Sequence, residues 1–131
     1  MKKIRIFAAL AALGLLLVGC STGTSAVTKL GIEEFSVKAA QSGVITLDVR
    51  TPMEFAEGHL ENAVNIDFQS GYFAEEVAKL DKNATYAVYC RSGNRSGEAV
   101  KVMADLGFTS IYDMDGGVID WASAGKPLYT N

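Results

Sequence analysis

The sequence has few of the residues that build disulfides and metal sites. Among 131 residues there are two cysteines, Cys20 and Cys90, and one histidine, His59. They form no C-x-x-C pair, which argues against a thiol–disulfide oxidoreductase. So few thiol and imidazole groups cannot fill a zinc shell. We therefore expect no metal and no cofactor.

Positive charge and long apolar runs are also scarce. Twelve Lys and Arg stand against fifteen Asp and Glu, which gives a formal net charge of −3. Without a basic stripe, nucleic-acid binding is not expected. The longest apolar run, residues 6–18, is shorter than the roughly 20 residues that a bilayer span needs. It is therefore not expected to remain as a transmembrane helix.

The N-terminal segment is typical of an exported protein. A basic start (residues 1–5) precedes the apolar run, and small residues follow, as in a secretion signal. The end of this leader, "LVGC", resembles the bacterial lipobox, which implies lipid on the Cys20 thiol and cleavage before it. We expect a signal peptide at 1–19, a lipidated tether at 20–28 and one folded domain at 29–131. The alternative is an ordinary signal peptide that is cleaved nearby.

Lipidation would place the domain on a membrane of the bacterial envelope, facing the periplasm in a cell with two membranes. It would also leave Cys90 without a disulfide partner, although export normally takes a chain to a compartment where disulfides form. A single thiol there is either buried and inert or kept for chemistry.

Strand-like and helix-like segments alternate along the domain, as in an α/β protein with a central parallel sheet and helices on both faces. Helix 51–58 has a capping box, with Thr51 before Pro52 and Glu54 three residues later. Ligands of such sheets bind beyond the carboxyl ends of the strands. The expected strands are 44–49, 63–66, 85–90 and 109–114, and the expected helices are 51–58, 71–80, 96–107 and 115–125.

Cys90 stands at such a strand end, directly before a helix. The helix N-terminus offers unpaired N–H groups and a positive dipole end. Arg91 and Arg95 add two cations, and Gly93 and Asn94 tolerate backbone conformations that turn successive N–H groups inward. All of these favour a thiolate, which is the nucleophilic form of cysteine. They also favour an anionic substrate.

Three segments in order carry a resemblance to one family. "CRSGNRS" (90–96), "LDVRTPMEFAEGHLENAVNI" (47–66) and "YDMDGGVIDWASAGKPL" (112–128) resemble the rhodanese family of sulfurtransferases. The likeness covers residues 29–128. One departure is Glu61-Asn62, where members often have Pro-Gly. Asn62 can adopt the left-handed conformation that glycine would take.

The resemblance implies that Cys90 takes the outer sulfur of a small anionic donor such as thiosulfate and holds it as a persulfide. The N–H groups of residues 91–95, and so of Arg91, Ser92, Gly93, Asn94 and Arg95, would cradle that sulfur. A thiophilic acceptor, cyanide in an assay and a thiol in the cell, would then remove it. A redox or sulfur-carrier protein of the periplasm would be a further partner.

The resemblance also gives roles to residues outside the loop. Asp48 and Arg50 would brace the loop, Asp48 as a hydrogen-bond acceptor and Arg50 in an ion pair. We expect His59 to be a hydrogen-bonded structural residue, because an ionised thiol needs no further base.

Two other functions remain open. Phosphatases and arsenate reductases also place a cysteine at a strand end before an arginine, but with one residue more between the two than the four here. A non-catalytic rhodanese-like binding module is the other alternative, although such modules usually lose the cysteine.

Overall fold

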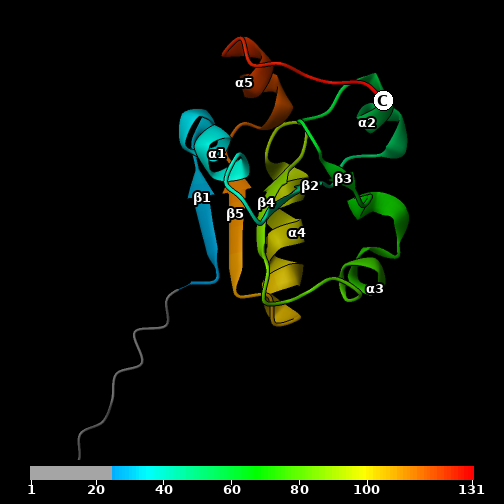
Figure 1. Ribbon diagram of the computed structural model, residues 1–131. Coiled ribbons are helices and arrows are strands. Elements are labelled where there is room, and N and C mark those ends of the chain that lie inside the picture. Colours follow the sequence, from blue (N-terminus) through cyan, green and yellow to red (C-terminus); the bar gives the residue numbers. More distant parts are fainter. Residues whose placement is uncertain (1–24) are drawn as a thin grey trace, which may run out of the picture.

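A five-stranded parallel sheet forms the centre of the protein (Figure 1). The computed structural model describes residues 25–131. The expected signal peptide and the lipid site at Cys20 lie outside these residues. The strand order is β1-β5-β4-β2-β3, so β4 lies in the middle of the sheet. The expected α/β architecture is confirmed.

The elements alternate along the chain as the sequence pattern predicts. The strands are β1 (Val27–Leu30), β2 (Val44–Asp48), β3 (Val64–Asn65), β4 (Thr85–Tyr89) and β5 (Ser110–Met114). The helices are α1 (Ile32–Ala39), α2 (Pro52–Glu57), α3 (Phe73–Val77), α4 (Asn94–Asp105) and α5 (Gly117–Ser123), with a 3-10 turn η1 (Phe68–Ser70).

The sheet divides the core into two halves, and β4 contributes buried side chains to both. Alternate residues of a strand point to opposite faces. Tyr86 and Val88 pack with α3 and α4 on one face, and Cys90 continues this series. Ala87 and Tyr89 pack with α1 and α5 on the other. The side chain of Cys90 therefore lies on the α4 face of the sheet.

Several boundaries differ from those expected. Val27 and Thr28, expected in the tether, form the first half of β1, because they pair with Ile111 and Tyr112 of β5. Strand β1 and helix α1 have no counterpart among the elements expected from the sequence. Helix α3 is only five residues long, half of the expected segment 71–80.

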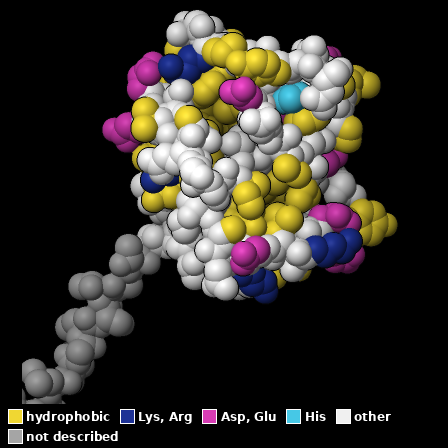
Figure 2. All heavy atoms as spheres, viewed as in Figure 1, with side chains coloured by type: hydrophobic (Ala, Val, Ile, Leu, Met, Phe, Trp, Pro, Cys, Tyr) yellow, Lys and Arg dark blue, Asp and Glu magenta, His cyan; other side chains and the backbone are white. Residues whose placement is uncertain are grey.

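A cavity among the described residues lies apart from the loop that follows β4. It has a volume of about 650 Å³ and lies among α1, β2, the segment after α2 and the C-terminal residues. On the face seen in Figure 2, hydrophobic side chains gather over the region of β2 and β3. None of residues 90–95 lines this cavity.

Among the described residues, no helix is long and apolar enough to cross a bilayer.

Candidate active site

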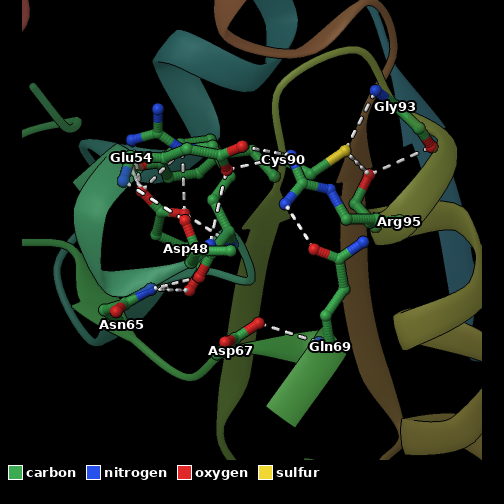
Figure 3. A network of polar contacts seen from close by, with 12 residues as sticks. Asp48, Glu54, Asn65, Asp67, Gln69, Cys90, Gly93 and Arg95 are labelled. Atoms are coloured by element: carbon green, nitrogen blue, oxygen red, sulfur yellow. Dashed lines mark hydrogen bonds and ion pairs between the residues drawn. The ribbon is translucent and has the colours of Figure 1, made fainter. Parts of the chain in front are cut away.

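The loop after β4 folds around the Cys90 sulfur (Figure 3). Cys90 is the residue after the last one of β4, and it is 1% exposed. The backbone N–H of Gly93 donates a hydrogen bond to Cys90 Sγ at 3.0 Å. The Ser96 hydroxyl lies 3.5 Å from the same sulfur. An N–H donor directed at sulfur can stabilise negative charge that develops there, because hydrogen bonds to a charged acceptor are stronger than those to a neutral one.

Gly93 can make this contact because of its backbone conformation. It precedes the first residue of α4 and has φ of 100°, in the left-handed region that favours glycine. A Cβ at this position would also lie 3.4 Å from the nitrogen of Gly116. Glycine therefore allows the loop to turn its N–H toward the sulfur at the start of α4.

Helix α5 holds the other side of the loop. The N–H groups of Val118 and Ile119 donate to the carbonyls of Cys90 (3.0 Å) and Arg91 (3.1 Å). Gly117 has φ of 61°, and a Cβ there would overlap the backbone of Arg91. The glycine pair of the closing segment thus lets α5 pack directly on the reactive loop.

Arg95 is positioned by a carboxylate that the sequence analysis did not assign to the site. Its guanidinium forms an ion pair with Glu54 at 2.9 Å and a long hydrogen bond of 3.5 Å with Gln69 (Figure 3). Glu54 also completes the expected capping box with Thr51, which is confirmed. Because Glu54 offsets much of the charge of Arg95, Arg95 is a weaker anion site than the sequence suggests.

Arg91 has the opposite surroundings. It is exposed, and its side chain takes part in no hydrogen bond or ion pair within residues 25–131. It lines a small cavity of about 330 Å³ beside the loop, whose other walls include Glu57, Val118 and Leu128. Arg91 is therefore the arginine whose charge is available to an anionic ligand.

Asp48 and Arg50 form a buried pair below the loop. The Arg50 guanidinium donates to the Asp48 carboxylate at 2.7 Å and to the carbonyl of Gly58 at 2.6 Å. The hydroxyl of Tyr89 donates to Asp48 at 2.6 Å and accepts from the N–H of Leu60 at 3.0 Å. The expected ion pair is present, and it ties β2 and β4 to the segment after α2.

Burial and charge fix the protonation of this cluster. Burial lowers the pKa of Arg50, but the hydrogen bonds and charge of Asp48 outweigh it and raise that pKa. Burial, with the charge of Asp48, raises the pKa of Tyr89 well above its usual value. Arg50 therefore stays charged and Tyr89 stays a hydrogen-bond donor at neutral pH.

His59 is 4% exposed, and none of its hydrogen bonds within residues 25–131 reaches Cys90. Its ring stacks on Phe55 with centroids 4.0 Å apart, and its nitrogens contact the carbonyl of Leu60 and the side chain of Asn131. This agrees with the expected structural role. Nearby, Asn62 adopts the expected left-handed conformation, with φ of 58°.

Two buried residues near the loop lie in the segments that carry the resemblance but received no role from the sequence. Ser96 is fully buried, and Asp113 on β5 is 1% exposed beneath α4. Within residues 25–131, no group of three or more His, Cys, Asp and Glu is arranged to hold a metal ion. The remaining loop residues, Ser92 and Asn94, are exposed, and their expected roles stay predictions.

The chain that forms this sheet and loop matches a family model. The model described as "Rhodanese-like domain" matches residues 32–124. The chain belongs to the rhodanese-like family. The expectation drawn from the three sequence segments is thereby confirmed.

Individual relatives and a solved structure support the same family assignment. A sulfurtransferase of Allochromatium vinosum is 29% identical over 103 residues, which cover 78% of this chain and 94% of the relative. Thiosulfate sulfurtransferase GlpE of Pseudomonas aeruginosa is 35% identical over 83 residues, which cover 63% and 74%. The crystal structure of a rhodanese-related protein from Thermoplasma volcanium superposes with a TM-score of 0.70 at 30% identity, covering 79% and 98%. The family thus includes sulfurtransferases.

Proposed function

We propose that the protein is a thiosulfate sulfurtransferase that works through a persulfide on Cys90. The observation that carries the proposal is the 3.0 Å hydrogen bond from the Gly93 N–H to Cys90 Sγ, in a loop closed by α5. A buried thiol that was only part of the core would need no N–H directed at its sulfur. The relatives named as sulfurtransferases support the same assignment.

The reaction has two displacement steps. The Cys90 thiolate attacks the outer sulfur of thiosulfate, the sulfur–sulfur bond of the donor breaks, and sulfite leaves with the electron pair. A thiophilic acceptor, cyanide in an assay or a thiol in the cell, then attacks the outer sulfur of the persulfide, and the Cys90 thiolate leaves. Each step forms one bond to sulfur and breaks one, so neither needs a cofactor.

Loop length distinguishes this activity from that of a phosphatase. Four residues separate Cys90 from Arg95, and the Gly93 N–H already contacts the sulfur itself. An N–H donor so near the thiol suits a single sulfur atom, whereas a phosphate ester needs a wider ring of donors around its oxygens.

Two colorimetric assays test the proposal. The wild type is expected to form thiocyanate from thiosulfate and cyanide, and to release almost no nitrophenolate from an aryl phosphate. Cys90→Ser should abolish the transfer, because a hydroxyl is a poor nucleophile toward sulfur. A glycine inserted between Ser92 and Gly93 should also abolish it by moving the N–H away. Efficient hydrolysis of the aryl phosphate with no formation of thiocyanate would refute this proposal and favour the phosphatase alternative.

A location for the protein is proposed from the sequence alone. Lipid on Cys20 would anchor the domain to a membrane of the bacterial envelope, with residues 21–26 as the remaining tether. Cys20→Ser should then release the protein from the membrane fraction or leave it unprocessed. A wild-type protein that is freely soluble, with an unmodified Cys20 thiol, would contradict the anchor.

A further inference from the structure

One edge of the sheet is only partly covered by its last strand. β3 has two residues, which pair with Leu47 and Asp48 at the end of β2 (Figure 1). The first three residues of β2, 44–46, pair with β4 on one side but have no strand on the other side within the described part of the chain. Such an uncovered edge is a template on which another chain can form a strand. We call residues 44–46 the open edge of β2.

The open edge presents one backbone donor and one backbone acceptor. Consecutive residues of a strand in a parallel sheet direct their N–H and C=O groups to alternate sides. The C=O of Asp48 accepts from the N–H of Ile66 at 2.9 Å, on the side of β3. Thr46 and Val44, two and four residues earlier, direct their groups to the same side. The N–H of Val44 donates to the C=O of Gln41 at 3.2 Å. The Thr46 N–H and the Val44 C=O have no backbone partner among the described residues.

The cavity of about 650 Å³ lies directly beside these groups. Val44, Ile45 and Thr46 all line it, and its volume is in the range of roughly 300–1,000 Å³ that is common for binding sites. Thr46 is 5% exposed, and its hydroxyl makes no hydrogen bond within residues 25–131. Because buried polar groups are normally paired, the cavity holds an unused polar side chain as well as unused backbone groups.

The walls of the cavity fit apolar side chains. Thr46 pairs with Ala87, which packs with α1 and α5, so the Thr46 side chain lies on that face of the sheet. In an added strand, the two residues that flank the one opposite Ile45 would point to the same face as Val44 and Thr46. The cavity walls on this face include the side chains of Ala39, Leu60, Trp121 and Pro127.

The rim of the cavity carries a negative charge without an ion-pair partner. Glu61 and Lys126 both line the cavity. Lys126 forms an ion pair with Glu33 at 3.0 Å. Glu61 is exposed and forms no ion pair within residues 25–131. A basic side chain therefore complements this rim better than an acidic one.

We propose that the open edge of β2 binds an extended segment of another protein, with two apolar residues two positions apart and basic residues beside them. The segment adds a short strand to the sheet next to β3, which is a general mode of peptide recognition. Its residue opposite Ile45 donates to the Val44 C=O and accepts from the Thr46 N–H. The two neighbours of that residue place their apolar side chains in the cavity, and a basic side chain lies near Glu61.

The test uses the ¹⁵N-labelled full chain and the peptide acetyl-KVTVK-amide. The two valines of this peptide share one face of an extended strand, and the order of its side chains is the same in both directions. The amide signal of Thr46 should move downfield and its hydrogen exchange should slow as peptide is added, because the N–H gains an acceptor. The same peptide with every backbone nitrogen methylated should cause neither change, because it cannot donate to the Val44 C=O. A Thr46 signal that stays unchanged up to millimolar peptide would overturn the proposal.

Two substitutions test the cavity and the charge. Ala40 is exposed and lines the cavity, so Ala40→Trp should fill the cavity and abolish binding without loss of the fold. Glu61→Gln should weaken the affinity for the basic peptide by up to about fivefold, as expected for an exposed ion pair. The matched control Glu75→Gln removes an exposed carboxylate from α3, on the other face of the sheet, and should leave the affinity unchanged. Full affinity in Ala40→Trp would contradict the assignment of the cavity.

Two further outcomes would overturn the proposal. Equal affinity for acetyl-EVTVE-amide would show that the open edge does not select a basic partner. A Thr46 signal that moves with protein concentration in the absence of peptide would assign the edge to a second copy of this chain. None of these measurements uses thiosulfate, and none of residues 90–95 lines the cavity. The outcome is therefore independent of the proposed sulfur transfer.

Discussion

At the scale of single residues, the two arginines of the loop have different electrostatic surroundings. Arg95 is held by Glu54 at 2.9 Å in a half-buried ion pair, and Gln69 lies on its other side. Arg91 is exposed and carries no such partner among the described side chains. We infer that Arg91 supplies most of the attraction for an anionic donor, while Arg95 mainly shapes the loop.

Neutralising Glu54 should strengthen the binding of an anionic donor. Glu54→Gln keeps an acceptor for the Arg95 guanidinium but removes the negative charge. Loss of the negative charge should strengthen the attraction of Arg95 for the donor, whereas a weaker hold on the guanidinium would misplace it. We expect the gain in attraction to dominate, because Gln preserves the hydrogen bond. The KM for thiosulfate in the thiocyanate assay should fall, roughly twofold to tenfold, since a charge-assisted contact is worth about 1.5–3 kcal/mol before solvent screening.

The matched control is Glu34→Gln, which removes one exposed carboxylate from α1. It should leave the KM unchanged, which would separate the local effect from that of net charge. An unchanged or higher KM in Glu54→Gln would show that the geometry of Arg95 matters more than its charge.

The sequence predicts some of these residues and not others for a physical reason. The strand end, the glycine and the helix N-terminus around Cys90 are adjacent in sequence. The sequence alone therefore predicts a reactive thiol at this position. Glu54 already has a local explanation in the capping box with Thr51, and its ion pair with Arg95 spans 41 positions. Asp113 likewise gives no sign that its strand face leads to the loop. Contacts that arise from the packing of distant elements leave no local pattern.

At the scale of elements, α5 is part of the active-site structure. Its first N–H groups bind the carbonyls of Cys90 and Arg91, and Gly117 brings the helix within contact of the loop backbone. The loop conformation thus depends on a helix that supplies no side chain to the sulfur.

Gly117→Ala should disrupt this packing. Alanine in the left-handed region costs about 1–2 kcal/mol, and its Cβ would in addition overlap the Arg91 backbone. We expect a loss of stability beyond that conformational cost and a large fall in thiosulfate turnover, measured by denaturant unfolding and the thiocyanate assay.

Gly125→Ala is the control for this variant. Gly125 has φ of 75° and nothing within 4 Å of its Cβ position, so it carries the conformational cost without the overlap. It should lose the smaller amount of stability and keep turnover. Equal effects of the two variants would contradict the role of α5.

The elements missed from the sequence are those with weak local signals. Strand β1 has four residues, two of them exposed, and forms an edge of the sheet. Helix α1 begins at Ile32, after Gly31, which provides no side-chain cap, and has one fully buried residue, Phe35. By contrast, β4 has four buried, mostly apolar residues after Thr85, and α4 begins directly after a glycine and has a regular buried face. Their pattern was sufficient to predict them.

At the scale of the whole molecule, the parallel topology brings the site together. The segments after β2, β4 and β5 meet at one end of the sheet, where α2 and α5 also lie (Figure 1). Asp48 ends β2 and Arg50 lies in the segment after it, Cys90 begins the segment after β4, and the glycine pair lies in the segment after β5. The alternation of strands and helices predicts that these segments lie at one end of the sheet. It does not predict the strand order, which places β4 between β2 and β5.

The central claim is that Cys90 accepts sulfur from thiosulfate. The most direct measurement is the intact mass of the purified protein before and after incubation with thiosulfate, with Cys90→Ser treated in parallel. The wild type should gain the mass of one sulfur atom and lose it again on addition of cyanide, while Cys90→Ser gains nothing. A folded wild-type protein whose mass does not change, or a variant that gains the same mass, would contradict a persulfide at Cys90.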